Sequence, residues 1–189
     1  MRATRRLTGV LAMVTAGMVT AGLALTACGT TTTTTRARAT PDASAPPCRT
    51  AALTWSLVLL GGSENGGLRP NARMTAINKG SKTCVFDGYP GVEIHNGKAE
   101  SIDGSGLGHP APLPLPGKAA VTVDLRYVPR DPKGTNTWCV RQSEAVVWAP
   151  HDSDRVVVPV TDAHRKSVTL DACGQIIAME PPRRASTGS

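Results

Sequence analysis

Short runs of apolar and β-branched residues recur through most of the chain, and Gly, Pro, Asn or Asp interrupts them about every ten residues. Such runs predict the strands of a β-sandwich or barrel, because alternate side chains of a strand lie on one buried face. Helical periodicity of useful length is absent. The predicted strands are Leu53–Leu60, Ala72–Asn78, Cys84–Phe86, Val92–His95, Ala119–Val128, Glu144–Trp148, Val156–Val160, Ser167–Leu170 and Ile176–Met179.

The interruptions indicate where the chain turns. Asn96 and Gly97 form a two-residue hairpin signal, because both residue types tolerate positive φ. The stretch from Asp103 to Gly117 contains four glycines and four prolines, so we expect a long surface loop there and no central strand. One all-β domain of two packed sheets, spanning residues 48–181, is therefore the simplest organisation.

The beginning of the chain has the order of a secretion signal. Arg2, Arg5 and Arg6 precede an uncharged, largely apolar stretch that ends at Ala27. This is the pattern of the charged and apolar regions of a signal peptide. Threonines and glycines dilute the stretch, which disfavours the competing interpretation as a membrane-spanning helix. We therefore expect residues 1–27 to be a signal peptide.

The last residues of that stretch resemble a bacterial lipobox. Leu25, Thr26 and Ala27 precede Cys28, and small residues before a cysteine suit the narrow site of a lipoprotein signal peptidase. Ordinary secretion with a nearby cleavage site is the alternative. Two or three acyl chains on Cys28 would hold the protein durably to a membrane, whereas one chain binds only marginally. Cys28 is thus the predicted lipidation site, and the predicted location is the extracellular face of the cell membrane.

Flexible segments are expected on both sides of the domain. Residues 28–47 contain six consecutive threonines, followed by arginines, alanines and prolines. No apolar face can be drawn on this segment, so it cannot bury enough surface to offset the entropy of ordering. We interpret it as a tether with a root-mean-square length on the order of 25 Å. Residues 182–189 are interpreted as a disordered tail on the same grounds.

The formal net charge of +7 does not describe the domain itself. Between Cys48 and Glu180, 14 Lys and Arg stand against 13 Asp and Glu, so this part of the chain is nearly neutral. The other basic residues lie in the predicted signal, tether and tail. No basic stripe interleaved with aromatic residues occurs, which argues against nucleic acid as a partner.

Five cysteines are present, and lipidation of Cys28 would leave four. Cys48, Cys84, Cys139 and Cys173 form an even set, which predicts two disulfides in an oxidising compartment. Four cysteines allow three pairings. We favour Cys48 with Cys84 and Cys139 with Cys173, because each pair then closes one half of the domain in sequence order. The spacings lack a CxxC motif and an adjacent histidine, which disfavours a zinc site.

One segment carries a family resemblance. Residues Asn78–Val92 read Asn-Lys-Gly-Ser-Lys-Thr-Cys-Val-Phe-Asp-Gly-Tyr-Pro-Gly-Val. Together with Trp138-Cys139, Val146–Pro150 and Cys173-Gly174, this segment resembles the family of domain of unknown function 4232, DUF4232, which occurs in secreted proteins and lipoproteins of high-GC Gram-positive bacteria. The resemblance implies an immunoglobulin-like antiparallel β-sandwich with two disulfides. It supplies no activity.

Candidate chemistry is sparse, and three functional hypotheses remain. The histidines are scattered, so we assign no catalytic residue, no metal site and no cofactor. The leading hypothesis is a non-enzymatic cell-envelope lipoprotein, attached to the membrane through Cys28, that binds an extracellular protein, polysaccharide or small ligand. A cell-wall hydrolase or transferase with His109, His151 and Asp152 in loops is the alternative from another class. A structural envelope spacer is the third.

Overall fold

The computed structural model describes residues 45–61, 69–97, 100–134 and 138–186. Apart from the short 3-10 helix η1 (Thr50–Ala52), every regular element described is a strand, which confirms the all-β prediction. No helix in this part of the chain has the length and apolar character needed to cross a bilayer. The strands are β1 (Leu53–Leu59), β2 (Ala72–Asn78), β3 (Cys84–Phe86), β4 (Gly91–His95), β5 (Ser101–Gly106), β6 (Leu113–Leu115), β7 (Ala120–Pro129), β8 (Cys139–Gln142), β9 (Glu144–Trp148), β10 (Val156–Thr161), β11 (Leu170–Met179) and β12 (Arg183–Arg184).

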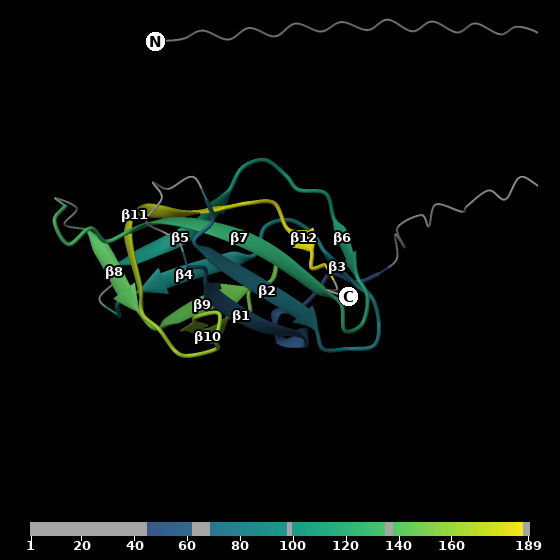
Figure 1. The fold of residues 1–189 in the computed structure, drawn as a ribbon. Coiled ribbons are helices and arrows are strands. Elements are labelled where there is room, and N and C mark those ends of the chain that lie inside the picture. Colours follow the sequence, from purple (N-terminus) through teal and green to yellow (C-terminus); the bar gives the residue numbers. More distant parts are fainter. Residues whose placement is uncertain (1–44, 62–68, 98–99, 135–137, 187–189) are drawn as a thin grey trace, which may run out of the picture. The chain divides into compact units, whose positions relative to one another are not determined.

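Eight of these strands close into a barrel (Figure 1). Their order around it is β7, β2, β1, β10, β9, β4, β5 and β11, and β11 pairs back onto β7. The expected immunoglobulin-like sandwich of two antiparallel sheets is not what the strand pairing shows. The sheet is continuous, and two of its pairs are parallel: β1 with β10 and β5 with β11.

Strand β11 explains how the barrel closes. Its first half pairs with β8 and its second half with β5, while β7 runs along its other edge. The change of partner coincides with an irregularity between Cys173 and Ala178, where Gly174 has a φ of 92°. A bulge of this kind bends a strand and increases its twist. Because β11 bends there, this one strand takes part in the closed sheet and also pairs with β8, an edge strand outside the barrel that we call the β8 flap.

The stretch from Asp103 to Gly117 corrects another expectation. The sequence predicts a surface loop, but β5 lies between β4 and β11, and β6 pairs with β3. The glycines of β5 are required by close neighbours. A Cβ atom at Gly104 would lie 2.3 Å from Cγ1 of Val92, and one at Gly106 would lie 2.2 Å from the ring of Tyr89. Glycine in a strand can mark such a close approach, so it did not exclude a central strand here.

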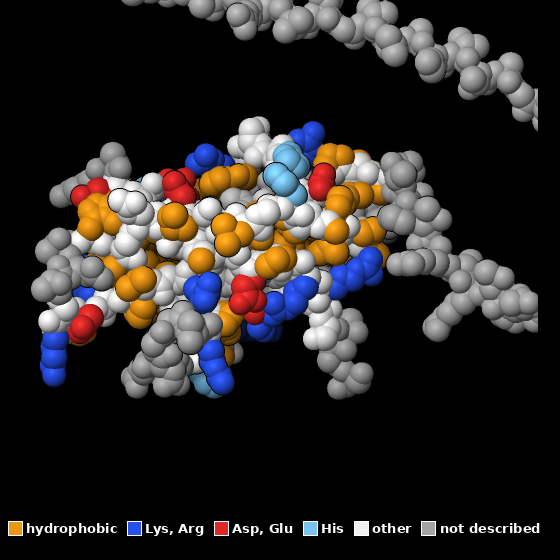
Figure 2. Space-filling model, turned by 90° about the horizontal axis from the view of Figure 1, so that it is seen from above, with side chains coloured by type: hydrophobic (Ala, Val, Ile, Leu, Met, Phe, Trp, Pro, Cys, Tyr) orange, Lys and Arg blue, Asp and Glu red, His pale blue; other side chains and the backbone are white. Residues whose placement is uncertain are grey.

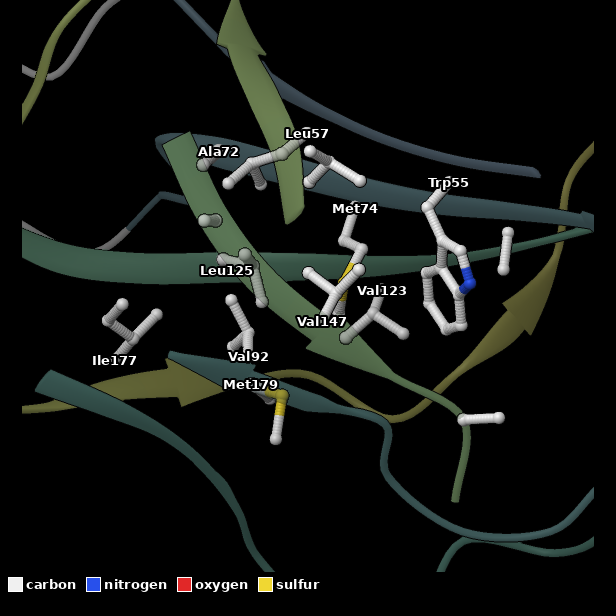
Figure 3. Close-up of a cluster of buried hydrophobic side chains, with 14 of the residues drawn as sticks. Trp55, Leu57, Ala72, Met74, Val92, Val123, Leu125, Val147, Ile177 and Met179 are labelled. Carbon is white, nitrogen blue, oxygen red and sulfur yellow. The ribbon is translucent and has the colours of Figure 1, made fainter. Parts of the chain in front are cut away.

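The core fills the barrel with aliphatic side chains (Figure 3). Leu57, Met74 and Val147 are almost completely buried and come from β1, β2 and β9. The alternating burial along β1 and β2 follows from the two-residue period of a strand. Trp55 belongs to this core, whereas Trp138 keeps 39 % of its surface exposed.

A two-stranded sheet, β3 with β6, caps one end of the barrel. Phe86 and Leu115 of this cap are fully buried, and the Phe86 ring lies 6.4 Å from that of Trp55. The side-chain amide of Asn78, at the end of β2, donates hydrogen bonds to the carbonyl groups of Leu115 and Lys82. These bonds attach the cap to the end of the barrel where β2 ends and β1 begins.

The two disulfides have the favoured pairing and lie at opposite ends of the barrel. Cys48 is bonded to Cys84 at the start of β3, beside the cap. Cys139 is bonded to Cys173, its direct partner in the pairing of β8 with β11. One bond therefore secures the cap, and the other joins the β8 flap to the barrel.

The C-terminal segment departs from the disordered tail expected for residues 182–189. Arg183 and Arg184 form β12, which continues along β7 beyond the end of β11. Arg183 and Arg73 both pair with Asp124, whose side chain is buried beneath them. Burial alone would raise the pKa of Asp124, but the hydrogen bonds from the two arginines outweigh it and lower that pKa. This ion cluster holds the segment against β7. The last three residues of the expected tail lie outside the described residues.

Candidate functional site

A small pocket lies at the far end of the β3–β6 cap, where three loops meet. Its walls come from the β3–β4 loop, the β5–β6 loop and the β9–β10 loop. The pocket has a volume of about 200 Å³. Its lining residues are Asp87, Gly88, Tyr89, Gly108, His109, Pro110 and His151. Residues that are distant in sequence thus share one concave surface.

Tyr89 forms the fixed wall of the pocket. Its hydroxyl group donates a hydrogen bond to the carbonyl oxygen of Leu107 at 2.9 Å. The ring lies directly against the backbone of Gly106, where any Cβ atom would overlap it. The side chain is therefore held at both its ring and its hydroxyl, and Tyr89 is a fixed part of the pocket lining.

His151 enters the pocket from the turn after β9. Its backbone is left-handed, with a φ of 59°, and Gly88 opposite it has a φ of 106°. A Cβ atom at Gly88 would lie 3.7 Å from Nε2 of His151, in ordinary contact. Gly88 is therefore required by its backbone conformation and not by lack of space. Gly88 lies in the β3–β4 loop and His151 in the β9–β10 loop, so the strands of the cap and the barrel determine where both residues lie.

Asp152 holds that turn in place from below. Its carboxylate accepts a hydrogen bond from the backbone N–H of Thr50 at 2.7 Å. It also forms an ion pair with Arg49 at 3.3 Å. The hydroxyl oxygen of Thr50 in turn accepts a bond from the N–H of Ala149 at 2.9 Å. The hydrogen bonds from Thr50, first from its backbone, lower the pKa of Asp152 from 3.8 to about 2. The carboxylate is thus committed to joining η1 to the β9–β10 loop.

The structure brings together two of the three residues proposed for hydrolase or transferase chemistry. His109 and His151 line the same pocket, but Asp152 is buried against Thr50. Asp152 is therefore not among the residues that line the pocket with the two histidines. The described residues that line the pocket include no Ser, Thr or Cys. Among the described residues, no group of three His, Cys, Asp or Glu is placed to hold a metal ion.

Gly91, which also belongs to the motif segment Asn78–Val92, supports the barrel next to the pocket. Gly91 of β4 is the cross-strand partner of Trp148 in β9, and the indole covers the glycine. The guanidinium carbon of Arg155 lies 4.3 Å from the centroid of the Trp148 ring. Arg155 also pairs with Glu93 at 2.8 Å. The motif glycine therefore makes room for an aromatic ring, a relation that single-sequence reasoning missed because the two residues lie 57 positions apart.

The described residues also line other hollows on the surface. A second pocket, of about 290 Å³, lies at the opposite end of the barrel and includes Glu93, His95 and Glu144. Nδ1 of His95 lies 3.6 Å from the carboxylate of Glu93. On the face shown in Figure 2, hydrophobic side chains are dispersed among polar ones. Exposed apolar residues scattered in this way do not by themselves mark a binding surface.

Fold and site together define a small all-β domain, held by two disulfides, with a loop-built pocket beside its cap. The chain belongs to the family of the domain of unknown function DUF4232, whose model matches residues 48–175. No curated protein and no solved structure matches the chain. The match includes the cap, the pocket and all four disulfide cysteines, and it ends within β11.

Proposed function

We propose that this protein is a lipid-anchored component of the cell envelope whose barrel domain binds a ligand on the extracellular side without catalysing a reaction. Residues 1–27 would be removed as a signal peptide, Cys28 would carry the lipid, and residues 28–47 would connect it to the domain. The observation that carries the binding function is the pocket formed by Tyr89, His109 and His151.

The lining of the pocket suits a polar ligand with a flat or ring-shaped face. The Tyr89 ring offers a rigid stacking surface, and imidazole groups both donate and accept hydrogen bonds. Asp87 adds a carboxylate acceptor at the rim. Pockets for drug-sized molecules usually occupy about 300–1,000 Å³, so this smaller pocket fits one unit or one terminal group of a longer molecule. A cell-wall saccharide has these properties.

Two features favour binding over hydrolysis or group transfer. The Tyr89 hydroxyl already donates to Leu107, and Asp152 is engaged with Thr50. A nucleophile with an adjacent, oriented base is the usual arrangement for covalent catalysis. In the part of the chain that the structure describes, the pocket lining holds no hydroxyl or thiol side chain other than that tyrosine. The two imidazoles are thus better placed to contact a ligand than to activate a nucleophile.

The anchor is tested by intact mass spectrometry of the protein from native membranes. We expect a chain that begins at Cys28 and carries the added mass of two or three acyl groups. A secreted chain with an unmodified or absent Cys28 would overturn the anchoring part of the proposal and leave the binding part standing.

The pocket is tested by nuclear magnetic resonance titration with a panel of soluble cell-wall disaccharide and glycan fragments. We expect at least one fragment to shift the signals of the pocket residues, and His109→Ala with His151→Ala to weaken its binding about tenfold or more, or about 1.4 kcal/mol. His164→Ala, in an exposed turn between β10 and β11, is the matched control. Absence of binding by every fragment would favour the spacer hypothesis, and turnover of a fragment would favour the enzyme.

A further inference from the structure

Basic side chains gather at the other end of the cap, and we infer that this surface docks onto anionic phospholipid headgroups. The surface, termed here the basic patch, consists of Arg49, Lys79, Lys82 and Lys118. It lies where β3 begins and β6 ends, since Cys84 pairs with Leu115 there. The pocket lies at the opposite end of the same two strands. The inference extends the proposed anchoring at Cys28 and gives the domain a defined orientation on the membrane.

Backbone contacts press the two lysine-bearing segments together. The N–H of Lys118 donates to the carbonyl oxygen of Asn78 at 3.0 Å, and the ammonium group of Lys118 donates to the carbonyl oxygen of Lys79. A Cβ atom at Gly117 would lie 2.6 Å from the backbone of Ser81, so the β6–β7 turn lies directly on the β2–β3 loop. The fold therefore holds these lysines close to one another.

The charge of the three lysines in the patch is not cancelled by acidic residues in the two segments that carry them. Residues 78–86 and 113–121 contain three lysines and no Asp or Glu, although the domain as a whole is nearly neutral. Lys79, Lys82 and Lys118 are exposed, and none of them forms an ion pair with any residue that the structure describes. Arg49 pairs with the buried Asp152 but keeps 64 % of its side chain exposed.

The N-terminal segment meets the domain at this patch. Pro47 forms a bridge with Val85 of β3, and Pro46 accepts a hydrogen bond from the N–H of Val85. Both prolines line a groove of about 510 Å³ together with Arg49 and Lys82. A lipid on Cys28 would therefore hold this end of the domain nearest to the bilayer. This position favours a phospholipid surface over a phosphate-bearing wall polymer as the binding partner of the basic patch.

The expected strength follows from the number of exposed lysines without an ion pair among the described residues. A lysine near an anionic membrane contributes about fivefold to the binding constant, so the three lysines together contribute about 100-fold. The effect depends on ionic strength, because the screening length is about 8 Å at physiological salt and about 3 Å at 1 M salt. Binding through the patch should therefore disappear at high salt, whereas an acyl anchor would persist.

The test uses the compact unit Ala39–Ser189, which contains every strand that the structure describes, the core and both disulfides but lacks Cys28. Its fold is checked by circular dichroism and by the absence of free thiols. Co-sedimentation is measured with vesicles of one third phosphatidylglycerol in phosphatidylcholine, and with pure phosphatidylcholine. We expect salt-sensitive binding to the anionic vesicles only, weakened about 100-fold in the variant K79Q/K82Q/K118Q.

The matched control is K133Q/R141Q/K166Q, which removes the same charge from exposed positions that lie outside the patch. We expect this variant to bind like the unmodified domain. Equal loss in both variants would show an effect of net charge and overturn the inference, as would equal binding to both kinds of vesicle. Binding to a soluble polyphosphate with no binding to vesicles would replace the membrane by a wall polymer. None of these outcomes depends on Cys28, so mass spectrometry of the native protein tests the anchor separately.

Discussion

Replacing Gly91 by alanine should disrupt the contact on which the start of β4 depends. The new Cβ atom would lie 1.7 Å from Cε2 of Trp148, far inside van der Waals contact. Moving the indole away would cost free energy, because Arg155 lies over its ring and is paired with Glu93. The substitution therefore forces either the ring or the strand to shift.

The change in the free energy of unfolding has three contributions, two that destabilise the folded protein and one that stabilises it. Overpacking of a well-packed site costs about 1–3 kcal/mol, and loss of the contact between Arg155 and the indole costs about 0.5–1 kcal/mol. Alanine also restricts the unfolded chain, which stabilises the folded protein by about 0.4–1 kcal/mol. This gain applies at Gly91 because its φ is not positive and alanine can adopt its backbone conformation. We expect a net loss of about 2 kcal/mol in the free energy of unfolding.

The assay is urea unfolding with the disulfides intact, followed by far-ultraviolet circular dichroism. Gly61→Ala is the matched control, because nothing lies within 4 Å of a Cβ atom at that position. It should leave stability unchanged or raise it slightly. In a Trp148→Ala background, Gly91→Ala should no longer be destabilising. An unchanged free energy for Gly91→Ala alone, or an undiminished loss in the Trp148→Ala background, would refute the reasoning.

Two further predictions concern the disulfides and the anchor of η1. Removing either bond, by Cys48→Ala with Cys84→Ala or by Cys139→Ala with Cys173→Ala, should lower the free energy of unfolding in urea by about 4 kcal/mol. The sequence separations, 36 and 34, are nearly equal, so a threefold difference between the losses would contradict this. Asp152→Asn should lower the urea midpoint at pH 6. Because the folded pKa is about 2 against the usual 3.8, this deficit should be complete above pH 4 and shrink as the pH falls towards 2. An equal deficit at pH 6 and pH 2.5 would show that the carboxylate charge is irrelevant.

Local features of the sequence were sufficient to locate most strands and the disulfide partners. The predicted strands Ala72–Asn78, Cys84–Phe86 and Glu144–Trp148 coincide with β2, β3 and β9. A strand is recognisable because alternating burial leaves a two-residue period in its own sequence. Of the three possible cysteine pairings, the one favoured from sequence order is the one that the structure contains.

The closure of the sheet, the path of β5 and the pocket were decided only by the tertiary structure. The glycines of β5 are explained by Val92 and Tyr89, which are neighbours in space and not in sequence. The parallel pairing of β1 with β10 joins segments about 100 residues apart, and no local pattern specifies such a partner. His109 and His151 share a pocket because three loops end at one side of the cap. The sequence by itself located most of the strands, because their two-residue period is local, and the packing of distant segments around one core determined the remaining strands, which strands meet and which side chains form a site.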